Sequence, residues 1–406
     1  MSVRIKRAGM RLGAIGVAVV TLAACSSDSG SNTATTDTTK AGGTTVNVTP
    51  TSFTSDFSAM AQLKDLASQG KGLIAVLLPD TTTSARYESF DRPYLTKAFE
   101  AAGLSSSDFK IDNAQGSAST MQTQAEAAIT QGATVLLIDA IDSGSGAAIQ
   151  ANAAAKGVKV IDYDRLTLGG AAGRYYVSFD NVKVGQLIGQ GEIDCIAAWK
   201  VANPNVLVMN GADTDNNAGQ FAEGYNGVLK PLFDAGTYTK VGEPPGTWTP
   251  SVAATTFQQQ LTAHPELNAV VTPNDDNANA VISVLQAQNV PPKTFPTTGQ
   301  DASLSGLQNI LKGYQCGTVY KPVYLEAQAA ATVAIYLNAG QTPPASLING
   351  STKDSQTNAD VQSVLLATVW VTTDNLAATV VKDEAVKKND LCISELSAAC
   401  TAAGIS

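Results

Sequence analysis

The feature that most restricts the fold of this sequence is a regular alternation of continuous apolar runs with segments of helical periodicity. The first run, at residues 73–78 (LIAVLL), is apolar at every position, which is typical of a strand buried on both faces of a parallel sheet. Apolar residues at helical spacing follow at 94–102, and Gly103 ends that segment. Repeated strand–helix units with short loops predict parallel sheets with right-handed crossovers, covered by helices on both faces.

The alternation occurs in two blocks that are separated near residue 178. Further strands are expected at 109–112, 135–138 and 158–161 in the first block, and at 206–209, 238–241 and 269–271 in the second. Helices are expected between them, near 121–129, 182–199, 220–233 and 252–263. Because the pattern restarts, we predict an α/β fold with two doubly wound parallel-sheet lobes.

The N-terminal segment has the features of an export signal. Basic residues precede an apolar run at 12–20, which is shorter than the ~20 residues that span a bilayer. The run ends in Leu22-Ala23-Ala24-Cys25, which resembles a bacterial lipobox, so we expect cleavage of residues 1–24 and acylation of the Cys25 sulfur. An ordinary signal peptide with a chance cysteine is the alternative. The sequence thus predicts an exported protein, lipid-anchored to the outer face of a bacterial cytoplasmic membrane.

The residues after Cys25 have the composition of a flexible tether. Residues 26 to about 52 are rich in Ser, Thr, Gly and Asp and lack the apolar residues that form a core. A short helical pattern follows at 57–66, and Gly70 ends it. We expect the lipidated cysteine and its tether to occupy residues 25–71, before the folded body begins.

Net charge and motifs exclude several classes of function. Residues 1–24 hold four basic and no acidic residues, so their removal leaves 26 − 4 = 22 basic and 35 acidic side chains, a net charge of 22 − 35 = −13. This charge argues against nucleic acid as a partner. No glycine-rich phosphate-binding motif follows an expected strand, so no cofactor is expected. The single histidine, His264, would have to serve any His-based catalytic or zinc site, and a structural or solvated role is the simpler interpretation.

The remaining cysteines are an even number, namely Cys195, Cys316, Cys392 and Cys400. Outside the cytoplasm such a set permits disulfides, with three possible connectivities. Cys392 and Cys400 are close in sequence, which favours that pair and leaves Cys195 with Cys316. No Cys-x₂-Cys spacing supports the rival interpretation of a metal site.

Short polar motifs follow the expected strands, at the strand ends where the ligands of open parallel sheets bind. They are YDR (163–165), YVSFDN (176–181), DNNA (215–218), ND (274–275), GQDA (299–302) and TVYKP (318–322). In this order they resemble the periplasmic sugar-binding proteins of ABC importers, of type I fold, and most closely their D-xylose-binding branch. The resemblance covers roughly residues 72–385.

The resemblance implies a particular division of the chain. Proteins of that family have two α/β lobes joined by a three-crossover hinge, with the sugar between the lobes. We therefore expect an N-terminal lobe of residues 72–177 plus 322–347 and a C-terminal lobe of 178–321 plus 348–390. A tail at 391–406 would hold one cysteine pair.

The resemblance also implies a sugar site without catalytic residues or metal. Asp, Asn and Arg suit such a site because their planar polar groups hold two adjacent hydroxyls, while an aromatic ring covers the C–H face of a pyranose. The family usually has Arg-Trp where this chain has Arg-Tyr, which affects the choice of sugar more than the sugar class. The matching residues are Arg86, Tyr87, Arg165, Asp215, Asn217, Trp248, Asn274, Asp301 and Lys321.

Seven of these residues, all except Arg86 and Tyr87, also have a structural interpretation. Arg165 would form a hinge ion pair with Asp164, Trp248 would be a core residue, and Lys321 would lie on the solvated surface. Helix capping or turn formation would account for the short polar residues, namely Asp215, Asn217, Asn274 and Asp301.

The expected function is capture without catalysis. The chain, as a monomer, would bind a monosaccharide (D-xylose or a related aldose) and deliver it to an ABC permease in the membrane. A sugar-sensing receptor subunit is one alternative. A glycoside-processing enzyme is another, and it would need two carboxylates ~5–10 Å apart. Sugar-responsive repressors share the fold, but they carry an N-terminal DNA-binding helix pair where this chain has an export signal.

Overall fold

The computed structural model describes residues 46, 48–81 and 83–405. The predicted export signal, Cys25 with its acylation, and the first part of the predicted tether lie outside the described residues. No helix in the described ranges is long and apolar enough to cross a membrane.

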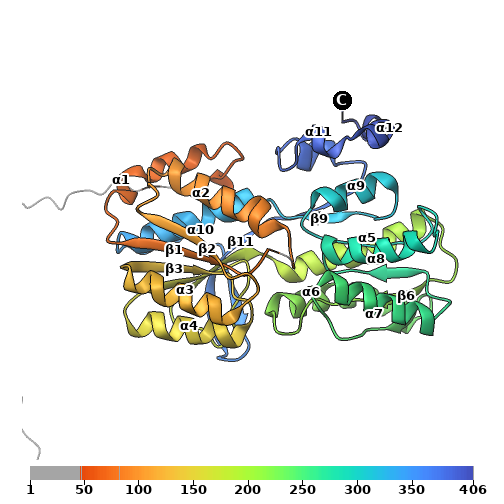
Figure 1. The fold of residues 1–406 in the computed structure, drawn as a ribbon, viewed down its shortest axis with the longest axis horizontal. Coiled ribbons are helices and arrows are strands. Elements are labelled where there is room, and N and C mark those ends of the chain that lie inside the picture. Colours follow the sequence, from red (N-terminus) through yellow and green to blue (C-terminus); the bar gives the residue numbers. More distant parts are fainter. Residues whose placement is uncertain (1–45, 47, 82, 406) are drawn as a thin grey trace, which may run out of the picture. The chain divides into compact units, whose positions relative to one another are not determined.

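The N-terminal lobe is built on a seven-stranded sheet of order β10-β11-β5-β4-β3-β1-β2 (Figure 1). Its pairings are parallel, except for the antiparallel hairpin of β10 and β11. Within the sheet Val76 of β1 lies opposite both Ile111 of β2 and Leu137 of β3. The strands are β1 (Leu73–Leu78), β2 (Phe109–Asn113), β3 (Ala133–Ile138), β4 (Lys159–Tyr163), β5 (Tyr175–Phe179), β10 (Gly350–Asp354) and β11 (Ala359–Leu366).

Helices cover both faces of this sheet, which explains the continuous apolar run of β1. Ile74 and Val76 pack on one face with residues of α2 and α10, whereas Ala75 and Leu77 pack on the other with residues of α3 and α4. Figure 1 shows α2 and α10 on one side of the sheet and α3 and α4 on the other. Ser117 and Asp142 cap α3 and α4, because each side chain accepts a hydrogen bond from a first-turn N–H. The helices are α2 (Arg92–Ala101), α3 (Ala118–Thr130), α4 (Ser143–Ala155) and α10 (Val323–Asn338), with a π-helical turn η3 (Tyr87–Asp91) before α2.

The C-terminal lobe repeats this layering on a smaller sheet of order β7-β6-β8. Val206 and Val208 pack in the core beside α5 and α6, and Leu207 packs with α7 and α8. Isolated bridges at Val270–Thr297 and Gln300–Val319 continue the sheet towards an antiparallel pair of β9 and β12. The elements are β6 (Asn205–Val208), β7 (Thr239–Gly242), β8 (Ala269–Val271), β9 (Thr318–Tyr320), β12 (Val369–Val371), α5 (Asn181–Ala198), α6 (Asn216–Asp234), α7 (Pro250–Ala263), α8 (Asp275–Ala287) and α9 (Leu304–Lys312).

The chain passes between the lobes from β5 to α5, from β9 to α10 and from β11 to β12, which gives the expected three-crossover hinge. The expected boundary at residue 348 differs from the structure. Strands β10 and β11 belong to the N-terminal lobe, because β11 pairs in parallel with β5, with Val364 opposite Val177. Val364 and Leu366 are buried in that lobe's core, so the chain returns to the C-terminal lobe only at β12.

The predicted tether is wrong for residues 48–71, which belong to the folded body. They form η1 (Pro50–Ser52), η2 (Ser58–Leu63) and α1 (Lys64–Ala67), as the helical pattern at 57–66 indicated. Phe57, Met60 and Leu63 are buried in the core of the N-terminal lobe, and the Gln328 side chain of α10 donates to the Thr54 carbonyl oxygen at 2.9 Å. The apolar side chains of this segment therefore find a surface to bury.

Both predicted disulfides are present. Cys195–Cys316 joins the end of α5 to the segment before β9, with 5.7 Å between the Cα atoms, and Cys392–Cys400 closes a loop in the C-terminal tail. That tail packs on α9 through Leu391 and Leu396. The remaining short elements are η4 (Ala377–Val381), α11 (Lys388–Leu391), η5 (Ser394–Leu396) and α12 (Ser397–Ala402).

Candidate functional site

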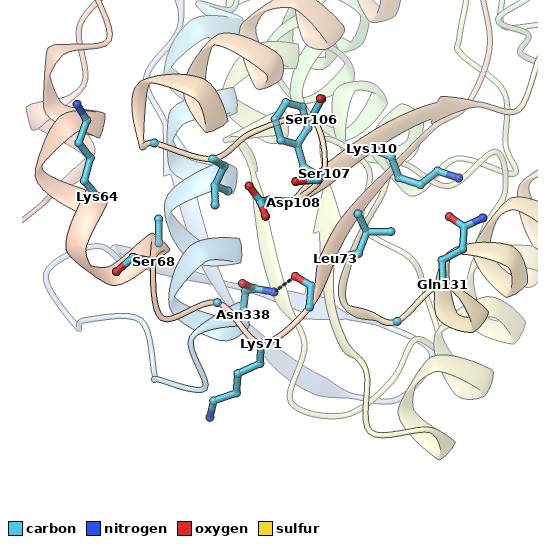
Figure 2. A pocket seen from close by; sticks show the side chains of 17 residues that line it. Lys64, Ser68, Lys71, Leu73, Ser106, Ser107, Asp108, Lys110, Gln131 and Asn338 are labelled. Atoms are coloured by element: carbon cyan, nitrogen blue, oxygen red, sulfur yellow. Dashed lines mark hydrogen bonds between the residues drawn. The ribbon is translucent and has the colours of Figure 1, made fainter.

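One large cavity lies away from the predicted residues. It measures about 970 Å³ at the amino ends of β1 to β3, and the exposed Lys64 and Lys71 stand at its rim with Asp108 and Lys110 (Figure 2). Asn338 of α10 fixes its floor by donating to the Gly72 carbonyl oxygen at 2.7 Å. The polar motifs of the sequence lie at the opposite edge of the sheet, where the strands end. The site is therefore identified by its polar side chains and not by the volume of its cavity.

All the predicted sugar-site residues line one small cavity between the lobes. They stand in it with five residues that the sequence analysis did not select, Thr83, Ser84, Asp164, Phe221 and Gln300. The cavity measures about 30 Å³, roughly the space of one water molecule, whereas ligand pockets usually exceed ~300 Å³. Side chains of the two lobes therefore meet across it, and a sugar ring needs the lobes to move apart.

Arg86 organises the wall on the N-terminal lobe. Its Nε and Nη2 donate to the Asp91 carboxylate at 2.9 and 2.6 Å, Nη2 also donates to Glu326 at 2.7 Å, and Nη1 donates to Asp164 at 2.9 Å. Burial lowers the pKa of Arg86, but the carboxylates of Asp164, Asp91 and Glu326 outweigh it, so the pKa lies above its usual value. Most of the guanidinium N–H groups of Arg86 therefore already donate to carboxylates of this lobe.

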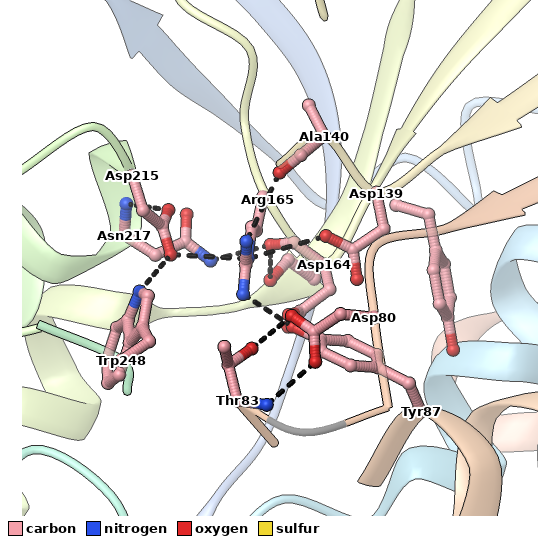
Figure 3. Close-up of polar contacts among 12 residues, drawn as sticks. Asp80, Thr83, Tyr87, Asp139, Ala140, Asp164, Arg165, Asp215, Asn217 and Trp248 are labelled. Carbon is pink, nitrogen blue, oxygen red and sulfur yellow. Dashed lines mark hydrogen bonds and ion pairs between the residues drawn. The ribbon is translucent and has the colours of Figure 1, made fainter. Parts of the chain in front are cut away.

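Arg165 reaches across to the second lobe. Its Nε lies 3.2 Å from Asp215 Oδ2 and 3.5 Å from Asp139 Oδ1 (Figure 3). Its Nη2 donates to the Tyr87 hydroxyl at 2.9 Å, and Nη1 donates to the Ala140 carbonyl oxygen at 3.3 Å. The structure therefore pairs Arg165 with Asp215 and Asp139, and not with the neighbouring Asp164 that the structural interpretation proposed.

Asp164 is a site residue that the sequence analysis considered only as an ion-pair partner. It is buried at a positive φ of 56°, and its carboxylate lies 3.7 Å from Lys321 Nζ as well as beside Arg86. Its backbone carbonyl oxygen accepts from the Asn217 amide at 2.7 Å, across the lobes. Burial raises the pKa of Asp164, but Arg86, Lys321 and Arg165 outweigh it and lower the pKa to about 2. Its position in the YDR motif is the sequence feature from which it could have been predicted.

Asp215 combines both roles that the sequence left open. One carboxylate oxygen caps α6 by accepting from the Asn217 N–H at 2.9 Å, and the other accepts from the Trp248 indole N–H at 3.0 Å (Figure 3). Burial raises the pKa of Asp215, and Arg165 opposes that shift. Because a carboxylate has two oxygens, helix capping and a place in the cavity wall are compatible.

Trp248 lies at the cavity and is only half-buried, so it is not a core residue. Its ring meets Phe221 edge-on, with 6.4 Å between centroids and 75° between planes. A Cβ at Gly211 would lie 2.1 Å from Cζ2 of Trp248. Gly211 therefore provides the space in which the indole ring lies.

The remaining predicted residues complete the wall on the C-terminal lobe and the hinge. Asn274 caps α8, accepting from the Asn277 N–H at 2.9 Å. Lys321 is buried, with Nζ 3.1 Å from Asp301 Oδ1, so it is not a solvated surface residue. Burial lowers the pKa of Lys321, but Asp301 and Asp164 outweigh it and raise the pKa.

A further contact between the lobes lies beside the cavity. The Ala85 N–H of the N-terminal lobe donates to Asp276 Oδ2 on α8 at 3.1 Å. Burial raises the pKa of Asp276 to about 6, with the Ala85 hydrogen bond opposing the shift and Asp301 and Asp80 adding to it. Asp276 directly follows the ND motif (274–275), but it was not predicted from the sequence as a site residue.

Two other expectations concern residues outside the cavity. His264 is partly exposed and lies 3.3 Å from Glu266, as a solvated residue would. Among the residues that the structure describes, no group of three or more His, Cys, Asp and Glu side chains is arranged to hold a metal ion.

Comparison with known proteins gives consistent matches. Residues 74–342 match the periplasmic binding protein domain family. The chain is 34% identical over 332 residues to the D-xylose-binding periplasmic protein of Escherichia coli, covering 81% of this chain and 96% of that protein. It is 31% identical to the multiple sugar-binding periplasmic receptor ChvE of Rhizobium radiobacter, over 67% of this chain and 80% of the receptor. A carbohydrate transporter solute-binding protein from Chloroflexus aurantiacus, solved with D-glucose, superposes with a TM-score of 0.70 at 27% identity, over 79% of this chain and 98% of that one.

Proposed function

We propose, since the chain belongs to the periplasmic binding protein family, that it is the sugar-capturing component of an ABC importer. It is an exported binding protein and not an enzyme, and D-xylose or a related aldose is the proposed ligand. The prediction of the family, the α/β two-lobe fold and this function class is confirmed by the matches to sugar-binding relatives. The observation that carries the proposed site is that all the predicted contacts line one cavity between the lobes.

The charges of the cavity suit an uncharged polyol. The cations Arg165 and Lys321 are already matched by Asp215 and Asp301, so a sugar acid or phosphate would meet carboxylates. Neighbouring sugar hydroxyls both donate and accept, as these paired groups require. Hydrogen bonds to charged groups contribute ~1.5–3 kcal/mol each, and a micromolar ligand needs only about −8 kcal/mol, so a few bonds and stacking on Trp248 suffice.

Capture by hinge motion follows from the size of the cavity. Polar contacts hold the lobes together around it, including Arg165 with Asp215, Asn217 with the Asp164 carbonyl oxygen, and Ala85 with Asp276. A sugar enters when these contacts open, and its hydroxyls then join both walls and favour closure. The closed form is the one that would dock on the permease.

The experiment is a calorimetric titration of the protein, purified without its export signal, against a panel of pentoses and hexoses. We expect D-xylose or a related aldose to bind, and Trp248→Ala to weaken that binding. Absence of binding by every pentose and hexose, with the protein folded, would contradict the proposal.

We also propose that the protein acts as a monomer. A separate proposal is that an acylated Cys25 anchors it to the membrane, which the lipobox at the end of the apolar run supports. Cys25→Ser should move the protein from the membrane fraction to the soluble fraction in cell fractionation. Retention of the variant on the membrane would argue for a different attachment.

A sugar-sensing receptor subunit is the second candidate, because one relative is named as a multiple sugar-binding receptor. Deletion of the gene separates the two candidates. Loss of uptake of labelled sugar supports import, whereas normal uptake with a lost sugar response supports sensing.

A further inference from the structure

A buried carboxylate, Asp139, lies directly behind the cavity wall without lining the cavity. It follows β3 immediately, and its backbone N–H donates to the Leu77 carbonyl oxygen at 3.0 Å, which fixes it in the N-terminal lobe. Neither carboxylate oxygen makes a hydrogen bond to any part of the chain that the structure describes. Arg165 is its charged neighbour at 3.5 Å (Figure 3).

One N–H of Arg165 therefore faces two carboxylates from different lobes. Nε lies 3.2 Å from Asp215 in the C-terminal lobe and 3.5 Å from Asp139 in the N-terminal lobe. A single N–H cannot form a short, linear bond to both at once. The other polar contacts of the guanidinium, to Tyr87 and Ala140, are within the N-terminal lobe, so Arg165 moves with that lobe.

We propose, building on the sugar-capturing function above, that Asp139 is a positioning residue. It forms the ion pair with Arg165 when the lobes open and Asp215 moves away. Opening carries Asp215 away, because Asp215 caps α6 of the C-terminal lobe. A buried guanidinium needs a carboxylate partner, and Asp139, in the same lobe at 3.5 Å, supplies one. Asp215 thus stabilises the closed form and Asp139 stabilises the open form.

The electrostatics of the closed form agree with this competition. Burial raises the pKa of Asp139 well above its usual value, because the opposing effect of Arg165 is smaller. Burial also raises the pKa of Asp215, again against Arg165. Two buried carboxylates share one guanidinium in the closed form, and separating the lobes leaves Asp139 as the carboxylate that faces the Arg165 Nε.

The first measurement is lobe opening in the sugar-free protein, by small-angle X-ray scattering and by energy transfer between fluorophores on the two lobes. Asp139→Asn weakens the open-state pair, so we expect a smaller radius of gyration and a larger closed population. Asp215→Asn weakens the closed-state pair and should give the opposite shift. Opposite shifts support the proposal, and an unchanged or like-signed response of Asp139→Asn overturns it.

The second measurement is sugar affinity. Asp139→Asn should bind the sugar about three- to tenfold more tightly than the natural protein, because the open form that competes with binding is less stable. Unchanged or weaker binding overturns the proposal. If the natural protein binds no sugar, the proposed function fails, yet the sugar-free measurement still decides the role of Asp139.

Two variants serve as controls. Asp162→Asn also neutralises a buried carboxylate of the N-terminal lobe, but its partner Arg174, at 2.7 Å, is in the same lobe, so opening should not change. Asp139→Ser removes the carboxylate entirely and should shift opening in the same direction as Asp139→Asn. A purely structural Asp139 would alter stability in both Asp139 variants and leave opening as it is.

Discussion

The two walls of the cavity hold their polar groups in different ways. On the N-terminal lobe, Arg86 joins Asp91, Asp164 and Glu326 in a buried network of opposite charges. On the C-terminal lobe, Asp215 and Asn274 are held by the backbone of the helices that they cap. Charges in the first wall depend on one another, whereas each cap is positioned by the backbone of its own helix. The same kind of substitution should therefore affect folding in one wall and mainly binding in the other.

The largest expected effect tests the charge network. Arg86→Met leaves three buried carboxylates without their shared cation, which should lower the free energy of unfolding by ~3–5 kcal/mol. Denaturant unfolding measures this change. Lys230→Met, which removes an exposed ion pair with Asp234 on α6, is the control and should cost at most about 1 kcal/mol. Similar losses in the two variants would remove the contrast between the walls.

The second prediction tests the caps. Asp215→Ala should weaken sugar binding by about 100-fold, because it removes charged hydrogen bonds and the partner of the Trp248 indole, but should cost only ~1 kcal/mol of stability. Titration and thermal unfolding give the two values. Asp180→Ala removes the cap of α5, an exposed residue outside the cavity, and should leave sugar affinity unchanged. A stability loss above 3 kcal/mol for Asp215→Ala would place Asp215 with the charge network.

The third prediction concerns the position of the Trp248 ring, which a substitution at a neighbouring residue should shift. Gly211→Ala puts a Cβ 2.1 Å from the Trp248 ring, so the ring must shift, and we expect roughly tenfold weaker binding from lost stacking. The quenching of tryptophan fluorescence by sugar should fall with it. Gly219→Ala lies on α6 with open space around its Cβ, and it should keep full affinity. Equal affinity in both variants would show that the ring position does not matter.

The smallest effect concerns pH and the contact between the walls. The pKa of Asp276, raised to about 6 mainly by burial, should return towards the ordinary 3.8 when the lobes open. Closure then takes up a proton, so this group favours binding most below pH 4 and loses that contribution as pH rises through 6. We expect an affinity decrease of about fivefold across this window, after allowance for partial exposure. Titrations at several pH values should show a flatter profile for Asp276→Asn, and an identical profile would contradict the assignment.

The sequence predicted β1 to β4 and β6 to β8, most clearly β1, which is apolar at consecutive positions because it is covered on both faces. It failed for β11, whose lobe is decided by pairing with Tyr175–Phe179 far away in the chain. It also failed for residues 48–71, because burial of Phe57 and Met60 depends on the surface that α10 provides. Local composition carries neither kind of information.

The site shows the same limit. The residues predicted from motifs at the strand ends lie around one cavity, and their role in binding stays a prediction. Asp139, Asp164 and Asp276 were not selected, because an aspartate after a strand has the same local signal as a turn former. Their roles come from partners such as Arg86, 78 positions before Asp164, that only the folded chain brings into contact.

The Cys195–Cys316 disulfide makes most of the C-terminal lobe a covalently closed loop, with 121 positions between its ends. By loop-closure entropy such a bond contributes about 5 kcal/mol, and it forms only in an oxidising compartment. Before the bond forms, the lobe is correspondingly easier to unfold. Oxidation therefore stabilises the C-terminal lobe only once the protein has left the reducing cytoplasm.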